Sequence, residues 1–343
     1  MTPAIFGLSG TVLTADERAF FRDSDPAGYI LFGRNVENRA QLRALTDDLR
    51  SIHGREKLFV CIDQEGGRVA RMQPPHWLAF PPGEAFDRLY DIAPASAIEA
   101  ARSNAQALGM DLAEAGITVD CHPSLDVRQP GASDAIGDRA LGSEPLRVAA
   151  LGRAILDGLA RAGVAGCVKH MPGHGRALVD SHKLLPVVDA SAEELETDIA
   201  PFAALADAPV GMTAHIRYTA WDRENPATQS PFVIGEIIRG TIGFGGLLLS
   251  DDLDMQALSG TVPERALRSV EAGCDIALNC WAKMDDMVGI AAALPAMSAA
   301  TAQRLERALA ATGPGEAKDQ AELVARRDSL LALAGARAGT GVA

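Results

Sequence analysis

Eight short apolar runs, each followed by a longer segment with helical periodicity, limit the possible folds of this sequence more than any other feature. The runs are rich in valine, isoleucine, leucine and cysteine and do not alternate regularly with polar residues. This composition is typical of strands that are buried on both faces of a parallel sheet. The runs cover residues 4–8, 28–32, 58–62, 117–121, 164–168, 210–214, 246–250 and 275–278.

Eight strand-then-helix units predict an α/β fold, a single (β/α)₈ barrel of the TIM type. An open, doubly wound sheet is the main alternative. The barrel is favoured because the count of units reaches eight and because no G-x-G-x-x-G motif follows the first run.

Start signals mark several of the intervening helices. Thr14 and Glu17, like Ser191 and Glu194, have the spacing of a capping box. Ser230 is followed by proline, which fits an N-cap with proline in the first helical turn. We expect helices over residues 97–115, 144–162, 192–207, 231–240, 262–272 and 283–294.

The C-terminal segment differs from the repeating units. It is rich in alanine, and its leucines are spaced as in two helices separated by a glycine- and proline-containing turn at 312–315. We therefore expect a barrel domain over 1–295 and a helical extension over 296–343 that packs on the barrel and ends flexibly.

Charge and cysteine content restrict the partners and the compartment. The net charge of −13 argues against a nucleic-acid-binding surface. The five cysteines are an odd number without a C-x-x-C pair, so we expect them to be reduced and buried in a cytoplasmic protein. No run approaches the ~20 apolar residues of a membrane span, and the N-terminus does not resemble a signal peptide. We expect a monomer.

Polar side chains follow most of the predicted strands. In a barrel of this type, catalytic groups lie at the carboxyl ends of the strands, so these side chains should meet at one mouth. They are Asp63, Asp126, Lys169, His170, His215, Asp251, Asp252 and Asn279. Because neighbouring residues at a strand end point in opposite directions, one of Asp251 and Asp252 should face the pocket while the other anchors the loop. From position alone, Asp251 is either functional or a loop-stabilising carboxylate.

The segment from Lys169 to His182 concentrates charge on what we expect to be a mobile loop after the fifth strand. Proline and glycines at 172–175 prevent a regular helix there. If the loop curls, Asp180 lies beside His182, and a carboxylate partner stabilises a protonated imidazole that can donate a proton and later accept one. In isolation, such a triplet is also compatible with a solvated loop.

Two further interpretations concern ligands. Asp63 and Arg71 could hydrogen-bond sugar hydroxyls, or they could form a pair that only orders their loop. The histidines at 170, 174 and 182 could bind zinc in principle. However, the Pro172-Gly173 step removes the helical H-E-x-x-H spacing and Lys169 would repel a cation, so we expect no metal.

Three motifs together resemble glycoside hydrolase family 3, and more closely its bacterial β-N-acetylglucosaminidases of cell-wall recycling. They lie at 62–69, at 169–175 together with 180–182, and at 250–253, and the resemblance extends from about residue 5 to about residue 295. The resemblance implies a (β/α)₈ barrel and a retaining hydrolase without a cofactor. It further implies that terminal β-N-acetylglucosamine is removed from peptidoglycan fragments or chitin oligosaccharides.

The resemblance also implies residue roles. Asp251 corresponds to the nucleophile, His182 to the acid/base and Asp180 to its supporting carboxylate. The sugar-binding positions correspond to Asp63, Arg71, Arg139, Lys169 and His170. The chain departs from the usual family pattern at Met171, at Arg176-Ala177 and at Asp254, none of which removes a catalytic group.

Three alternatives remain open at this point. A neutral histidine acid/base would not repel phosphate, so the enzyme could be a phosphorylase. It could be a family 3 β-glucosidase, although those usually carry a second domain for which this chain has no room. It could also be a sugar-binding barrel without catalytic activity.

Overall fold

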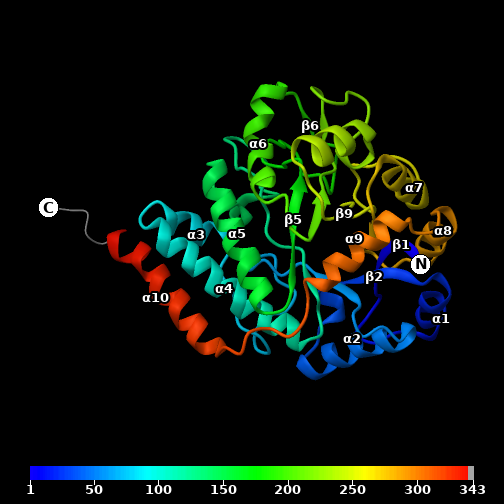
Figure 1. Ribbon diagram of the computed structural model, residues 1–343, viewed down its shortest axis with the longest axis horizontal. Coiled ribbons are helices and arrows are strands. Elements are labelled where there is room, and N and C mark those ends of the chain that lie inside the picture. Colours follow the sequence, from blue (N-terminus) through cyan, green and yellow to red (C-terminus); the bar gives the residue numbers. More distant parts are fainter. Residues whose placement is uncertain (339–343) are drawn as a thin grey trace.

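The computed structural model describes residues 1–338, which form an eight-stranded parallel sheet curled into a barrel with helices outside it (Figure 1). Along the sheet the strand order is β10-β1-β2-β3-β4-β5-β7-β9. The two end strands meet where the Asp275 N–H donates to the Leu248 carbonyl and the Ser250 N–H to the Ile276 carbonyl, both at 2.9 Å. The predicted barrel is confirmed, and the open sheet is excluded.

Each of the eight apolar runs overlaps one barrel strand. The strands are β1 (Thr2–Gly7), β2 (Pro26–Leu31), β3 (Phe59–Ile62), β4 (Val119–Asp120), β5 (Ala165–Met171), β7 (Val210–Thr213), β9 (Leu247–Leu249) and β10 (Ala277–Asn279). Two short strands, β6 (Val187–Val188) and β8 (Arg217–Tyr218), pair separately.

The helices follow the strands largely as expected. They are α1 (Ala15–Ser24), α2 (Arg39–His53), α3 (Gly83–Tyr90), α4 (Pro94–Glu114), α5 (Pro145–Arg161), α6 (Ala192–Ala204), α7 (Val262–Ala272), α8 (Met284–Ala293), α9 (Ala299–Ala310) and α10 (Gln320–Ala338). Both predicted capping boxes are present. Helix α3 was not predicted, because it is short and lacks a side-chain N-cap.

The segment expected to be an α-helix over 231–240 is a π-helix, η4 (Val233–Thr241). Its predicted start is confirmed, since the Ser230 hydroxyl accepts a hydrogen bond from the Val233 N–H at 3.1 Å. A capping signal determines where a helix begins and does not set its hydrogen-bond period.

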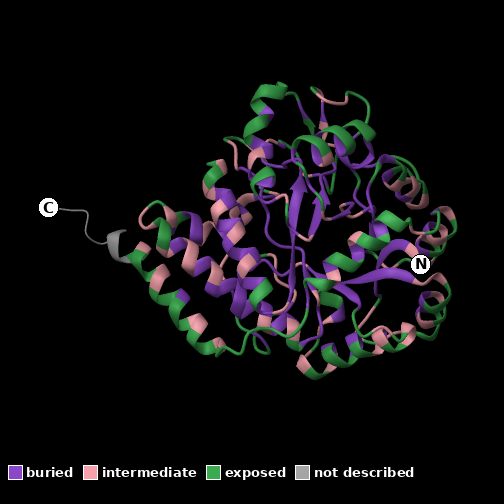
Figure 2. Ribbon diagram, viewed as in Figure 1, coloured by how far each residue is buried: buried purple, intermediate pink, exposed green. Residues whose placement is uncertain are grey.

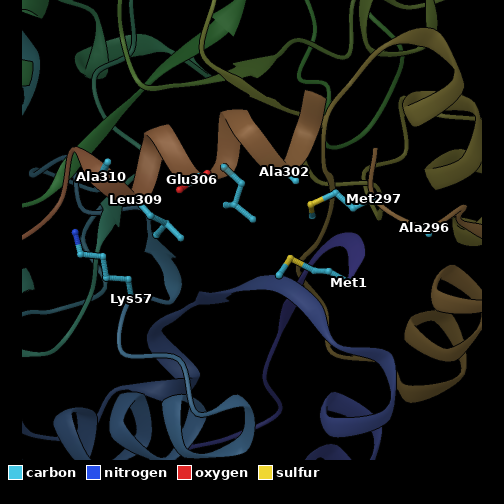
Figure 3. Close-up of a pocket in the computed structure, with 9 residues that line it drawn as sticks. Met1, Lys57, Ala296, Met297, Ala302, Glu306, Leu309 and Ala310 are labelled. Atoms are coloured by element: carbon cyan, nitrogen blue, oxygen red, sulfur yellow. The ribbon is translucent and has the colours of Figure 1, made fainter. Parts of the chain in front are cut away.

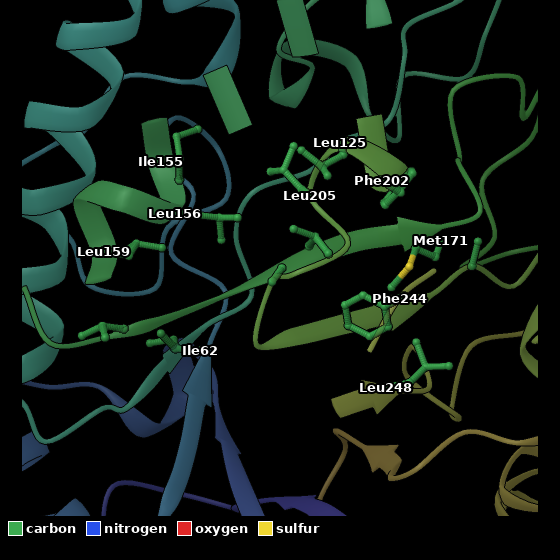
Figure 4. Close-up of a cluster of buried hydrophobic side chains, with 14 of the residues drawn as sticks. Ile62, Leu125, Ile155, Leu156, Leu159, Met171, Phe202, Leu205, Phe244 and Leu248 are labelled. Atoms are coloured by element: carbon green, nitrogen blue, oxygen red, sulfur yellow. The ribbon is translucent and has the colours of Figure 1, made fainter. Parts of the chain in front are cut away.

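The apolar core has two layers, which explains why the strands show no polar alternation. One cluster fills the barrel interior, and a larger one lies between the barrel and the helices. Ile5 belongs to the inner cluster and its neighbour Phe6 to the outer one. Figure 4 shows part of the outer cluster, with leucine and isoleucine side chains of α5 near the sheet. Figure 2 shows buried strands inside helices whose outer faces are exposed.

All five cysteines are buried and free, as predicted.

Strand β5 is longer than the apolar run that predicted it. It continues to Met171, so Lys169 and His170 lie within a buried strand, and the prediction of a mobile loop is wrong for these two residues. Neighbouring backbone on both sides extends the strand: the Leu125 N–H donates to the Lys169 carbonyl and the Ala214 N–H to the Met171 carbonyl, both at 2.7 Å.

The C-terminal segment forms the two expected helices. Helix α9 contacts β9, whereas α10 packs along α4 and α3 on the outside of the molecule (Figure 1). The domain division at residue 295 stays a proposal, and part of the expected flexible end, residues 339–343, lies outside the described residues. None of the described helices combines the length and apolarity that a membrane span requires.

Candidate active site

A cavity of about 210 Å³ lies at the carboxyl ends of the barrel strands. All eight residues proposed from the sequence line it, although they come from distant parts of the chain. They are Asp63, Arg71, Arg139, Lys169, His170, Asp180, His182 and Asp251. The polar residues expected at the strand ends are only partly the same set. Asp63, Lys169, His170, Asp251 and Asp252 line the cavity, whereas Asp126, His215 and Asn279 do not.

One wall of the cavity is a buried ion network. The Lys169 Nζ lies 2.9 Å from Asp63 Oδ1 and 2.8 Å from Glu65 Oε1. Arg71 donates to Asp63 at 3.2 Å, and Arg139 binds both oxygens of Glu65 at 2.7 and 2.9 Å. Burial alone would raise the pKa of both carboxyls, but the adjacent cations outweigh it and lower them, that of Glu65 strongly. The wall therefore presents fixed charges of both signs.

A second buried carboxylate, Asp126, orients two histidines. Its oxygens accept hydrogen bonds from His170 Nδ1 at 2.7 Å and from the backbone N–H of His174 at 2.6 Å. Burial opposes its ionisation, yet the neighbouring His170 imidazole holds the pKa of Asp126 far below its usual range. Because Nδ1 is bound to a carboxylate, His170 has only Nε2 available to a ligand.

Asp251 follows strand β9 and lines the cavity. Its Oδ1 accepts a hydrogen bond from the Asp252 N–H at 2.8 Å. Burial would raise the pKa of Asp251, but the imidazoles of His215 and His170, together with this N–H, lower it. The carboxylate is thus ionised at neutral pH, and an ionised carboxylate that lines a cavity has the chemistry of a nucleophile.

Asp252 anchors the loop, as expected for one member of the pair, although it also borders the cavity. Its oxygens accept hydrogen bonds from the Cys280 N–H at 3.2 Å and from the Trp281 indole N–H at 3.1 Å. Burial, followed by the nearby charge of Asp254, raises the pKa of Asp252 to about 7. The two adjacent carboxyls therefore differ in protonation.

His182 and Asp180 lie on the connection between β5 and β6, and the predicted pairing is present. His182 Nδ1 is 2.7 Å from Asp180 Oδ1, and the His182 N–H donates to the same oxygen at 3.0 Å. The His182 side chain is 69% exposed. Burial raises the pKa of Asp180, but these bonds from His182 outweigh it and lower the pKa.

The same connection is fixed at several points. Arg176, where the chain departs from the usual family pattern, donates to the buried Asp198 on α6 at 2.7 Å. His174 Nε2 lies 3.1 Å from the Ser181 hydroxyl, and the Ala257 N–H donates to the Ser181 carbonyl at 3.2 Å. Burial and the nearby His170 lower the pKa of His174 to about 4, so this histidine is neutral at pH 7.

Four residues outside the predicted set of eight support the site: Glu65, Asp126, His174 and His215. The sequence placed Asp126 and His215 after strands at the expected mouth, and it considered His174 only as a possible zinc ligand. Glu65 received no role, although it stands two residues after Asp63 in the same motif. Nothing in the sequence indicated which side chains they would contact, because those contacts join separate strands.

A larger cavity of about 530 Å³ lies at the opposite, amino-terminal end of the barrel (Figure 3). Its lining is mostly methionine, leucine and alanine, with Lys57 and Glu306 as charged members. It lacks the paired carboxylates and histidines of the first cavity.

Within residues 1–338, no group of three or more histidine, cysteine or acidic residues is arranged to hold a metal ion.

Known proteins resemble this chain over most of its length. The model of the glycosyl hydrolase family 3 N-terminal domain matches residues 10–310. The beta-hexosaminidase of Chromobacterium violaceum is 37% identical over 340 residues, which cover 98% of this chain and 93% of that protein. That of Bordetella avium is 39% identical over 283 residues, covering 81% and 80%.

Solved structures show the same likeness. The crystal structure of NagZ from Neisseria gonorrhoeae in complex with N-trifluoroacetyl-D-glucosamine has a TM-score of 0.86 and 31% sequence identity. The match covers 97% of this chain and 98% of that one. A family 3 beta-N-acetylglucosaminidase from Paenibacillus gives a TM-score of 0.78 at 31% identity over 99% of this chain and 63% of that chain.

Proposed function

This chain belongs to family 3 of the glycosyl hydrolases and is a β-N-acetylhexosaminidase, and we propose that it removes terminal β-N-acetylglucosamine by a retaining mechanism. The observation that carries this proposal is that three residues line the same cavity. They are the ionised Asp251 and the imidazole–carboxylate pair of His182 and Asp180.

In the first step, Asp251 attacks the anomeric carbon while the glycosidic C–O bond breaks. His182 uses its Nε2 proton for the leaving oxygen, because its Nδ1 faces Asp180. The product is a covalent glycosyl ester on Asp251. In the second step, His182 takes a proton from water, the resulting hydroxide attacks the same carbon, and Asp251 is released. Two inversions retain the configuration.

The remaining polar wall would bind the sugar. Asp63 can accept hydrogen bonds from hydroxyls, whereas Arg71, Arg139, Lys169 and the free Nε2 of His170 can donate to them. Because the ion network fixes these groups before substrate arrives, binding requires little reorganisation.

The exposed His182 suggests a conformational step. A proton donor that is 69% exposed is still largely in contact with water. We propose that the loop closes over the bound sugar and so excludes water around the acid/base group. The family resemblance points to a muramyl peptide fragment as the leaving group, and to the cytoplasm as the place where the reaction occurs.

The central test is Asp251→Asn, which preserves shape and removes the nucleophilic charge. We expect kcat to fall by about a thousandfold or more on an aryl β-N-acetylglucosaminide, with the melting temperature preserved. NMR of the unmodified enzyme should show the β-anomer as the first product. Substantial activity in D251N, or an α-anomer formed first, would contradict the mechanism.

The same assay separates the alternatives. Faster turnover of the matched aryl β-glucoside would indicate a β-glucosidase. A sugar 1-phosphate formed in the presence of inorganic phosphate would indicate a phosphorylase. Binding without turnover would indicate an inactive barrel.

A further inference from the structure

Trp281 is a large exposed aromatic side chain at the catalytic mouth. It follows strand β10 by two residues, and 61% of it is exposed. Single exposed apolar residues are common on protein surfaces and by themselves carry no function. Trp281 differs because a hydrogen bond links it to a residue of the cavity wall. Its indole N–H donates to Asp252, the residue next to Asp251.

A second side chain, besides Asp252, contacts the indole. The Lys283 Nζ lies 5.7 Å from the ring centroid, and that ammonium is also 3.3 Å from a carboxylate oxygen of Asp254. Ala282, between the two, has a φ of 55°, a left-handed conformation that alanine rarely adopts. One face of the ring therefore carries the lysine, and the exposed fraction leaves ring surface open to solvent.

The cavity wall continues up to Trp281. Asp252 and Cys280, its hydrogen-bond partner and its chain neighbour, both line the cavity. Arg34 donates to the Cys280 carbonyl and stacks on Phe32, which also lines the cavity, at 4.9 Å from the ring centroid. Trp281 itself does not line the cavity and stands immediately outside it.

The size of the cavity determines what must lie outside. At about 210 Å³ it is smaller than the ~300–1,000 Å³ of pockets that take drug-sized ligands. It suits one sugar ring, so the leaving group of a disaccharide extends beyond it. A pyranose has a face of C–H groups that is apolar and slightly positive, which matches the negative face of an aromatic ring.

We propose that Trp281 is the platform on which a pyranose leaving group stacks, and that it sets the preference for substrates with a sugar in that position. This assignment rests on the proposed glycosidase function. It makes Trp281 a specificity residue that contacts the leaving group and takes no part in bond making or breaking.

Two substrates with the same sugar in the cavity test the proposal. N,N′-diacetylchitobiose has a sugar leaving group, whereas N-acetylglucosaminyl fluoride has none. We expect W281A to lower the ratio of kcat/KM for the disaccharide to that for the fluoride by about tenfold, mainly through KM. W281F, which keeps a ring but loses the N–H, should restore most of the ratio.

The control is F232A, which removes an exposed aromatic that does not line the cavity and should leave the ratio as it is. A general loss of fold in W281A would lower both rates and would not change the ratio. An unchanged ratio in W281A, with both substrates still hydrolysed by the unmodified enzyme, would overturn this inference alone. If the unmodified enzyme hydrolyses neither substrate, the proposed function and this inference fall together.

Discussion

Glu65 shows how a single residue without a predicted role can support a site. Its carboxylate lies between Lys169 and Arg139, and only 3% of its side chain is exposed. Two buried cations facing each other would repel strongly in a medium of low dielectric constant. The negative charge of Glu65 offsets this repulsion, so that both cations can line the cavity.

We predict that E65Q destabilises the protein by ~3–5 kcal/mol at pH 7, because it removes the carboxylate partner of the buried Arg139 and one of the two carboxylate partners of Lys169. The pKa of Glu65 is well below its ordinary value of 4.5 in the folded state. Its stabilisation is therefore complete above that value and is lost as the pH falls through the lower, folded-state pKa. The difference in unfolding free energy between the two proteins should shrink below about pH 4.5.

Chemical denaturation at several pH values measures this difference. E114Q is the matched control, since Glu114 pairs with Arg39 at the surface with 60% of its side chain exposed. Its effect should be within ~1 kcal/mol at every pH. Equal effects of the two substitutions would contradict the role given to Glu65.

At the level of elements, the connection after β5 carries the proposed acid/base residue. The path of this connection depends on Gly175. A Cβ added at Gly175 would lie 1.8 Å from the carbonyl oxygen of Val127, in the connection after β4. No side-chain rotation can relieve a clash with backbone. The close approach of these two connections therefore positions the segment that carries Asp180 and His182.

We predict that G175A displaces this loop and lowers kcat on an aryl β-N-acetylglucosaminide by about tenfold or more, because catalytic geometry tolerates little displacement. G235A is the control, since a Cβ at Gly235 meets nothing within 4 Å. Full activity in G175A would show that the loop does not need this approach.

At the scale of the whole molecule, the C-terminal helix α10 covers the outer surface of α4. Arg327 is the polar centre of this contact: it is 6% exposed, donates to Asn104 at 3.1 Å and lies over the Phe80 ring at 5.7 Å. These contacts join residues more than 200 positions apart in the chain.

We predict that R327A lowers the unfolding free energy by ~1–3 kcal/mol, because it removes a buried hydrogen bond and a cation–π contact. R326A is the neighbouring control: its 62% exposed side chain forms a surface ion pair with Glu99, worth at most ~1 kcal/mol. Thermal unfolding of both variants measures the difference. A smaller loss for R327A than for R326A would mean that α10 contributes little to the stability of the barrel.

The sequence by itself determined the barrel, its eight strands, most helix starts and the polar residues just after the strands. These properties depend on local patterns: apolar runs, capping pairs and the position of a residue just after a strand. The full set of eight residues that share the cavity followed from the motifs of the family resemblance. Only the tertiary structure decided that β5 extends through Lys169 and His170, that Glu65 and Asp126 hold the site together, and that Trp281 is attached to Asp252. Those contacts join residues 29 to 104 positions apart. Pairing and burial across such separations arise only when the strands come together, so no local pattern encodes them.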